Sequence, residues 1–207
     1  MESASLKSRT PVARSLGTSP NAQEMSRIVV VGSISAGKTT FSRRLAQTFG
    51  VPHVEWDGLR FARPEALADS QLFSPIVREA ITPERWVFDG LYTRNWQIME
   101  MVAGRATMVI WLNYAYPLVL WRVVKRSVSV GLQKPTLRGK ASGLLDRFFS
   151  RQSRPLRVTR TFQQRRKYIH TVLDAPVARH LKIIEFRKPE EAEEFLRGLK
   201  VHQPQVS

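Results

Sequence analysis

Apolar and polar positions alternate along the chain in the way expected of a parallel sheet wrapped by helices. Five short apolar runs, each of strand length, are separated by longer segments whose apolar residues recur at helical spacing. These runs occupy 28–31, 51–56, 85–89, 107–112 and 181–186. The fourth run is apolar throughout its centre, as a strand buried on both faces should be. The pattern predicts an α/β fold, a three-layer sandwich around a five-stranded parallel sheet.

The longer segments supply the predicted helices. The first follows the first strand and ends at Gly50, and a second is expected over 116–130. A stretch rich in glycine and basic residues, 131–143, separates the second helix from a further long helical region. The last helix begins at Pro189 and has four glutamates near its start. Its predicted apolar face consists of Ala192, Phe195, Leu196 and Leu199.

The two ends of the chain differ from the middle in composition. Residues 1–25 are rich in Ser, Thr and Pro and lack a hydrophobic period, so we expect a disordered tail. The alternative is a targeting segment, but Glu2 and the lack of an amphipathic repeat argue against it. The sequence predicts one kinase-like domain over 26–200 and a flexible C-terminus at 201–207.

Composition excludes several classes of protein. No run approaches the roughly 20 apolar residues of a membrane span, so we expect no membrane insertion. The chain has no cysteine, which rules out disulfides and thiolate catalysis, and its four histidines lack metal-ligand spacing. We expect a cytoplasmic monomer, in keeping with a reducing compartment.

Positive charge is concentrated in one part of the sequence. The formal net charge is +16, and residues 121–170 carry 14 Lys and Arg against a single Asp. A basic block of this kind suits a helical lid over nucleotide phosphates, which we place at about 127–160. It equally suits a surface that binds nucleic acid.

The first predicted strand leads into a phosphate-binding motif. The segment Gly32–Thr39 matches G-x-x-x-x-G-K-[ST] and lies between a β-branched strand and an amphipathic helix. In this motif glycines allow close approach of the backbone, and N–H groups at the helix start face the phosphates. The lysine reaches the β- and γ-phosphates and the hydroxyl ligates Mg²⁺. The predicted nucleotide-binding residues are Gly32, Ser33, Ser35, Ala36, Gly37, Lys38, Thr39 and Thr40.

Two aspartates follow predicted strands. Asp57 comes after the second and Asp89 after the third, and ligands of open α/β sheets bind at the carboxyl ends of strands. Asp57 could orient or deprotonate an acceptor hydroxyl, and Asp89 could hold Mg²⁺ together with Thr39. The alternative is that each Asp-Gly is only a turn. Trp56, beside Asp57, is a candidate for a pocket wall.

Arginines supply the remaining candidates. Arg122 and Arg126 lie one turn apart in an apolar helical segment, where a guanidinium is costly unless it meets an anion such as phosphate. A salt bridge or a solvated helix edge is the other reading. A second series, Arg151, Arg154, Arg157 and Arg160, has three-residue spacing, and one or two of its members could close over a phosphoryl group.

Taken in order, the motifs GSISAGKTT, HVEWDGLRF, RWVFDGLYTRNWQ, VIWLNY and WRVVKR resemble those of the adenylate-kinase-like P-loop kinases, closest to the DNA topology modulation and adenylate-kinase-related group. The resemblance covers about 27–200. It implies ATP at the loop, an acceptor site at Asp89 and Gly90, and phosphate-binding arginines at Arg122 and Arg126. Where adenylate kinases have Asp-Gly-Phe-Pro-Arg-Thr and then Gln, this chain has Arg94 one position later and then Gln97. This difference leaves the acceptor open among nucleotides, nucleosides and hydroxylated metabolites.

Three functions remain open on the sequence. The leading hypothesis is a kinase that transfers the γ-phosphoryl group of Mg²⁺–ATP to a small acceptor, with Lys38, Asp57, Arg122 and Arg126 as catalytic residues. Its acceptor would be bound by Asp57, Asp89, Gly90, Arg94 and Gln97. The alternatives are an ATP-gated module that binds nucleic acid, suggested by the basic block, and a simple NTPase switch.

Overall fold

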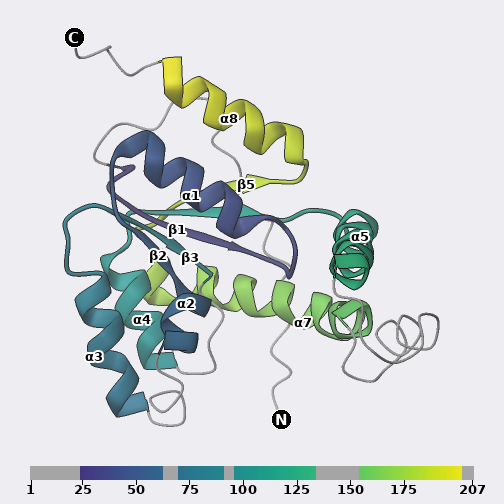
Figure 1. Ribbon diagram of the computed structural model, residues 1–207. Helices are drawn as coiled ribbons and strands as arrows, with labels where there is room; N and C mark the ends of the chain where they lie inside the picture. The colour runs from purple at the N-terminus through teal and green to yellow at the C-terminus, as the bar shows by residue number, and fades with distance from the viewer. Residues whose placement is uncertain (1–23, 63–69, 91–95, 134–153, 202–207) are drawn as a thin grey trace, which may run out of the picture.

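A five-stranded parallel sheet forms the centre of the molecule. The computed structural model describes residues 24–62, 70–90, 96–133 and 154–201. The strand order is β2-β3-β1-β4-β5, and every neighbouring pair is parallel (Figure 1). The predicted α/β fold with five parallel strands is therefore confirmed. The strands are β1 (Arg27–Gly32), β2 (His53–Glu55), β3 (Trp86–Asp89), β4 (Met108–Leu112) and β5 (Lys182–Phe186).

Alternate residues of β1 face two separate cores. Ile28 and Val30 pack with residues of α1, α5 and α8, whereas Val29 and Val31 pack with residues of α3, α4 and the C-terminal half of α7. Because side chains alternate along a strand, β-branched residues fill both layers. Figure 1 shows the resulting three layers, with α1 and α8 above the sheet and α3, α4 and α7 below it. The helices are α1 (Lys38–Phe49), α2 (Trp56–Ala62), α3 (Ser70–Ala80), α4 (Trp96–Arg105), α5 (Tyr116–Gln133), α7 (Arg154–Asp174) and α8 (Pro189–Val201).

The second strand is shorter than predicted, and this changes the role of Trp56. The strand ends at Glu55, and Trp56 starts α2. Trp56 is only 6% exposed and packs its ring on Phe73 and Phe88, at centroid distances of 5.2 and 6.3 Å. Its ring therefore belongs to the apolar layer below the sheet, and its role as a pocket wall stays a prediction.

Helices α3 and α4 were not predicted. α3 contains Pro75, a residue that normally argues against a helix interior, and α4 includes Gly104. Both pack their apolar residues against the lower face of the sheet. Burial therefore outweighs weak local propensity in these two segments.

The first described residues join the domain. Lys182 forms an ion pair with Glu24 at 2.7 Å, and Met25 packs against the upper core, although both were expected in the N-terminal tail. The rest of that tail, residues 202–207 and the central part of the predicted lid (134–153) lie outside the described residues. None of the helices that the structure describes is long and apolar enough to cross a membrane.

Candidate active site

The strand order places a crevice at the carboxyl ends of β1 and β3. These two strands are neighbours, yet β1 leads into α1 above the sheet and β3 into α4 below it. Ligands of open α/β sheets bind where neighbouring connections diverge in this way. The segments that meet here are the loop Ser33–Gly37, the start of α1, and the pair Asp89 and Gly90. The topology therefore brings together two motifs that lie about 50 residues apart in the sequence.

The loop after β1 has the backbone geometry of an anion site. A Cβ atom on Gly32 would lie 2.8 Å from the carbonyl oxygen of Leu112, so β1 and β4 approach closely only because residue 32 is glycine. Gly37 has a φ of 95°, in the region that favours glycine. α1 begins directly afterwards, with no side-chain cap and no acidic residue in its first turn. Its first N–H groups and the positive end of its dipole therefore remain available for an external anion.

Lys38 lies inside this loop. Its Nζ donates a hydrogen bond to the carbonyl of Ser33 at 3.0 Å. Burial lowers the pKa of Lys38, and the negative charges of Asp89 and Asp57 oppose this effect. A largely enclosed ammonium group with a single neutral hydrogen-bond partner is costly without an anion. A phosphate group in the loop would provide that anion.

Thr39 and Asp89 form the oxygen-rich side of the crevice. The Thr39 hydroxyl donates a short hydrogen bond to Oδ2 of Asp89, which is only 6% exposed. The other carboxylate oxygen, Oδ1, is buried and has no hydrogen-bond partner among the described residues. Burial raises the pKa of Asp89, while the Thr39 hydroxyl and the charge of Lys38 act in the opposite direction. A positive ion at Oδ1 would therefore favour the charged form of this carboxylate.

This donor set fits Mg²⁺. The ion prefers hard oxygen ligands and usually takes one or two from the protein, with phosphates and water supplying the rest. The Thr39 hydroxyl and the Asp89 carboxylate meet that requirement. In the described part of the chain no group of three or more His, Cys, Asp or Glu residues could form a complete metal cage. The site suits a metal that arrives with a nucleotide.

Arg122 reaches the loop from α5. Its Nη1 donates to the carbonyl of Ala36 at 2.9 Å, and its guanidinium carbon lies 5.2 Å from the centroid of the Tyr114 ring. It is half-buried, and no ion pair joins it to an acidic residue of the described regions. Within the described regions, Arg122 is therefore neither part of a salt bridge nor part of a solvated helix edge. Arg126, one turn further along, is exposed and makes no such contact with the loop.

The other predicted site residues lie at varying distances from this centre. Asp57 is exposed in the first turn of α2, and its charge raises the pKa of Lys38, so it lies within electrostatic reach of the loop. Gln97 is exposed in the first turn of α4 and makes no hydrogen bond with the described residues, whereas Arg94 lies outside them. Ser33 is buried and Thr40 exposed.

One arginine near the site was missed by the sequence analysis. The charge of Arg165, on α7, lowers the pKa of Lys38, so its guanidinium lies within electrostatic reach of the loop. The series at three-residue spacing drew attention to Arg160, which is exposed. No local signal marks Arg165, because its relation to Lys38 spans 127 positions of the chain.

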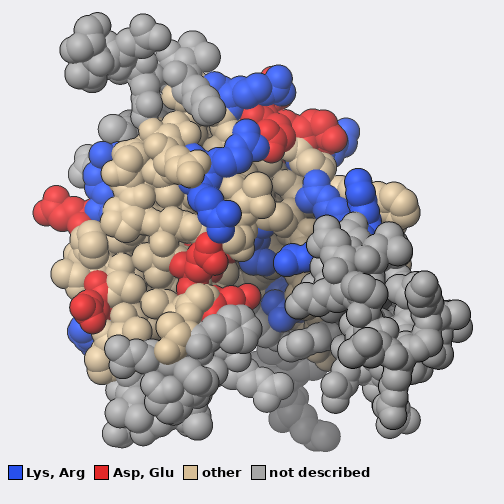
Figure 2. Space-filling model, viewed as in Figure 1, with Lys and Arg blue, Asp and Glu red and all other residues tan. Residues whose placement is uncertain are grey.

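Basic side chains flank the site. Between Tyr116 and Leu173, every charged residue in the described parts of α5 and α7 is Lys or Arg. Figure 2 shows basic side chains beside α5, at the right of the view, whereas acidic and basic groups mix over α1 and α8. There Arg44 of α1 pairs with Glu193 of α8 at 2.6 Å. Among the described residues, basic side chains without acidic neighbours on the same helices therefore lie on α5 and α7, the helices that carry Arg122 and Arg165.

Comparisons with known proteins give limited information. No family model matches the chain, and no curated protein matches it. Solved structures of similar fold include a shikimate kinase from Aquifex aeolicus, with 14% identity, a TM-score of 0.48, and coverage of 84% of this chain and 94% of the other. A gluconokinase from Sinorhizobium meliloti has 15% identity and a TM-score of 0.48, with coverages of 84% and 91%. A shikimate kinase from Acinetobacter baumannii in complex with shikimate has 18% identity and a TM-score of 0.46, with coverages of 86% and 92%. At this level of similarity, neither the activity nor the acceptor of this chain follows from these proteins.

Proposed function

We propose that this protein transfers the γ-phosphoryl group of Mg²⁺–ATP to a small acceptor that carries a hydroxyl or phosphate group. The observation that carries the proposal is the meeting of Lys38 with the Thr39–Asp89 pair at the switch point of the sheet. A phosphate loop needs a lysine, a hydroxyl and a strand-end carboxylate in this relation. The adenylate-kinase-like assignment within this class stays a prediction.

The loop would bind the nucleotide by its phosphates. On binding, Lys38 exchanges the Ser33 carbonyl for β- and γ-phosphate oxygens, which removes the cost of its enclosed charge. Thr39 and Asp89 would hold Mg²⁺, whose chemistry is to neutralise charge on the phosphate oxygens. Arg122 from α5 and Arg165 from α7 extend this positive environment.

Transfer would then rest on positioning and charge. The acceptor oxygen attacks the γ-phosphorus, the bond from that phosphorus to the β–γ bridging oxygen breaks, and ADP leaves with the electron pair. For a hydroxyl acceptor, Asp57 would orient the hydroxyl and take its proton; its exposure and its electrostatic effect on Lys38 support this role. No covalent enzyme intermediate is required.

Lys38→Ala tests the loop, and Lys188→Ala is a matched control on an exposed lysine after β5. The wild-type protein and the control should gain about 2.7 kcal/mol from Mg²⁺–ATP at 100 times its Kd, measured as a thermal shift, and Lys38→Ala should gain almost none. Without nucleotide, Lys38→Ala should be at least as stable as the wild type, since it removes an enclosed charge. An unchanged ATP-induced shift in Lys38→Ala would refute the site.

The acceptor is identified with γ-labelled ATP. Nucleoside monophosphates, nucleosides and small polyols are screened as separate classes, with Lys38→Ala as the blank. The proposal expects labelled product with at least one class. Release of labelled phosphate alone, whatever acceptor is added, would mean that the protein is an NTPase.

A further inference from the structure

We propose that Tyr114 is a positioning residue for the phosphate loop: its ring holds the guanidinium of Arg122, and Arg122 in turn holds the Ala36–Gly37 peptide in the orientation that binds phosphate. The inference deepens the proposed function and rests on it in so far as ATP is the probe. The phosphate-loop motif covers only Gly32–Thr39, so it gives no indication of Tyr114 or of any other residue that supports the loop from behind.

Tyr114 is rigidly placed. It follows β4 by two residues, is only 4% exposed, and packs in the core above the sheet. The preceding Asn113 ties this turn to β5, because its N–H donates to the carbonyl of Phe186 at 2.9 Å and its side-chain amide donates to Glu185 at 2.8 Å. The ring of Tyr114 is thus a fixed surface next to the loop.

Arg122 links that surface to the loop. The guanidinium carbon of Arg122 lies over the Tyr114 ring, 5.2 Å from the ring centroid, and Nη1 donates to the Ala36 carbonyl at 2.9 Å. A planar guanidinium stacks on an aromatic ring while donating in its own plane, which an ammonium group cannot do in the same way. The ring therefore supports the guanidinium from which Arg122 donates to the loop.

The direction of the Ala36 carbonyl decides what the loop offers to an anion. In a trans peptide the C=O and the following N–H point in opposite directions, so holding the Ala36 oxygen toward Arg122 turns the Gly37 N–H away from it. That N–H makes no hydrogen bond with the other described residues and is free for an anion. A flip of this peptide would present a carbonyl oxygen to the phosphate instead.

Gly37 lowers the steric cost of such a flip, so other residues must fix the orientation of the Ala36–Gly37 peptide. We call the pair Tyr114 and Arg122, which fixes it, the lock. Its φ of 95° is open to glycine, and the peptide before a glycine can rotate with little steric cost. A Cβ at this position would lie 3.6 Å from Nη1 of Arg122, so the guanidinium also packs against the glycine. Arg122 and Tyr114 supply the rigidity that the glycine lacks.

The lock does not depend on pH over the ordinary range. Burial raises the pKa of Tyr114 to about 12, so its phenol stays neutral in any physiological buffer. The positive charge of Arg122 acts against this rise.

The test compares Tyr114→Phe, which keeps the ring, with Tyr114→Leu, which removes it. Titration calorimetry with Mg²⁺–ATP should give Tyr114→Phe a Kd within about twofold of the wild type. Tyr114→Leu should give a Kd about 5- to 30-fold weaker, as expected for the loss of one cation–π contact. In an Arg122→Met background the same Tyr114→Leu change should have no further effect. Equal affinity of the Phe and Leu variants, or a Leu effect that persists in Arg122→Met, would overturn the inference.

A second measurement needs no nucleotide and remains available if Tyr114→Leu fails to fold. Relaxation of the Gly37 backbone amide in the free protein should show microsecond-to-millisecond exchange in Arg122→Lys, where the peptide is released, but not in the wild type or in Tyr114→Phe. An equally ordered Gly37 in Arg122→Lys would refute the lock. If the wild type binds no ATP, the proposed function is refuted. If the wild type binds ATP but the Gly37 amide shows no exchange in Arg122→Lys, only the role of Tyr114 and Arg122 is refuted.

Discussion

Replacing Gly32 by alanine tests whether the loop depends on the close approach of β1 and β4. The added Cβ would lie 2.8 Å from the Leu112 carbonyl oxygen, where ordinary contact is 3.4 Å or more, so the strands would have to separate by about 0.6 Å. The obstacle is backbone at the carboxyl end of the neighbouring strand β4, and it cannot rotate away as a side chain can. Overpacking of this kind costs about 1–3 kcal/mol, and we expect Gly32→Ala to lose that much free energy of unfolding.

Gly198→Ala is the matched control for this experiment. Gly198 lies in α8, and a Cβ there would meet no atom within 4 Å. The same chemical change should therefore stabilise the protein by about 0.5–1 kcal/mol, since alanine favours the helix. Urea unfolding followed by tryptophan fluorescence gives both values, because the chain has five tryptophans. Thermal shifts with Mg²⁺–ATP should fall for Gly32→Ala and stay unchanged for the control. Equal stability of the two variants would refute the reasoning.

Two further predictions concern the aspartates. Asp57→Asn should leave the Kd for Mg²⁺–ATP nearly unchanged and lower phosphoryl transfer by about 10²–10⁴-fold, the range for a lost acid–base group; full turnover with the best acceptor would make Asp57 only a turn residue. Asp89→Asn should abolish the Mg²⁺ dependence of nucleotide binding. Because burial raises the pKa of Asp89, its contribution to stability is present below its usual pKa of 3.8 and is lost as the pH rises through the folded value. Without metal, the stability of Asp89→Asn relative to the wild type should therefore rise with pH in urea titrations, and a constant difference would show that Asp89 carries no such penalty.

The fold could be predicted from the sequence where one physical signal dominates. Strands β1, β3 and β4 have continuous apolar runs that end at polar or turn residues, so their position follows from burial alone. The loop and the nearness of Asp89 followed from a local motif and from the rule that parallel strands end at one edge. Helices α3 and α4 could not be predicted in this way, since tertiary burial offsets the proline and the glycine that they contain.

The outer parts of the site were less predictable for a different reason. The burial of Trp56 and the approach of Arg165 to Lys38 depend on which side chains meet across the sheet, and spacing along the chain holds no such information. Arg122 was singled out as a guanidinium in an apolar segment, and its binding to phosphate stays a prediction. Its partners proved to be a carbonyl and an aromatic ring, which no pattern in the sequence indicates.

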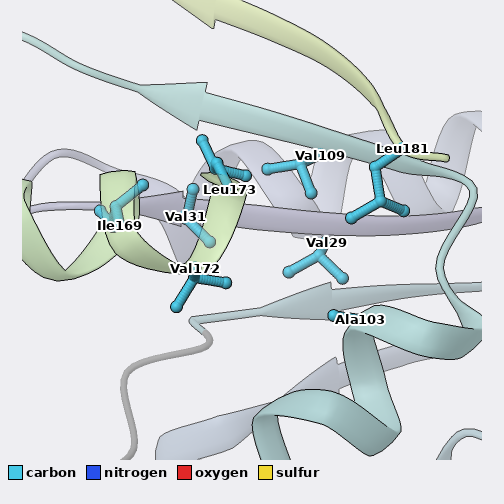
Figure 3. A pocket seen from close by; sticks show the side chains of 8 residues that line it. All are labelled: Val29, Val31, Ala103, Val109, Ile169, Val172, Leu173 and Leu181. Atoms are coloured by element: carbon cyan, nitrogen blue, oxygen red, sulfur yellow. The ribbon is translucent and has the colours of Figure 1, made fainter. Parts of the chain in front are cut away.

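Helix α7 packs in both cores, so a rotation about its contact with one core would displace its other end. Val158 and Phe162, near its start, pack with α5 in the upper core, whereas Ile169 and Val172 pack below the sheet. At the lower contact a small apolar cavity, barely large enough for one water molecule, separates α7 from β1, β4 and α4 (Figure 3). The helix start lies about 22 Å from Ile169 at 1.5 Å per residue, so a rotation of about 10° there would move it by about 4 Å. The atoms that line a void have fewer packing partners than those of a filled core, so the void lowers the cost of such a rotation. A substitution that fills this cavity would therefore act on the basic end of α7, although it lies far from that end.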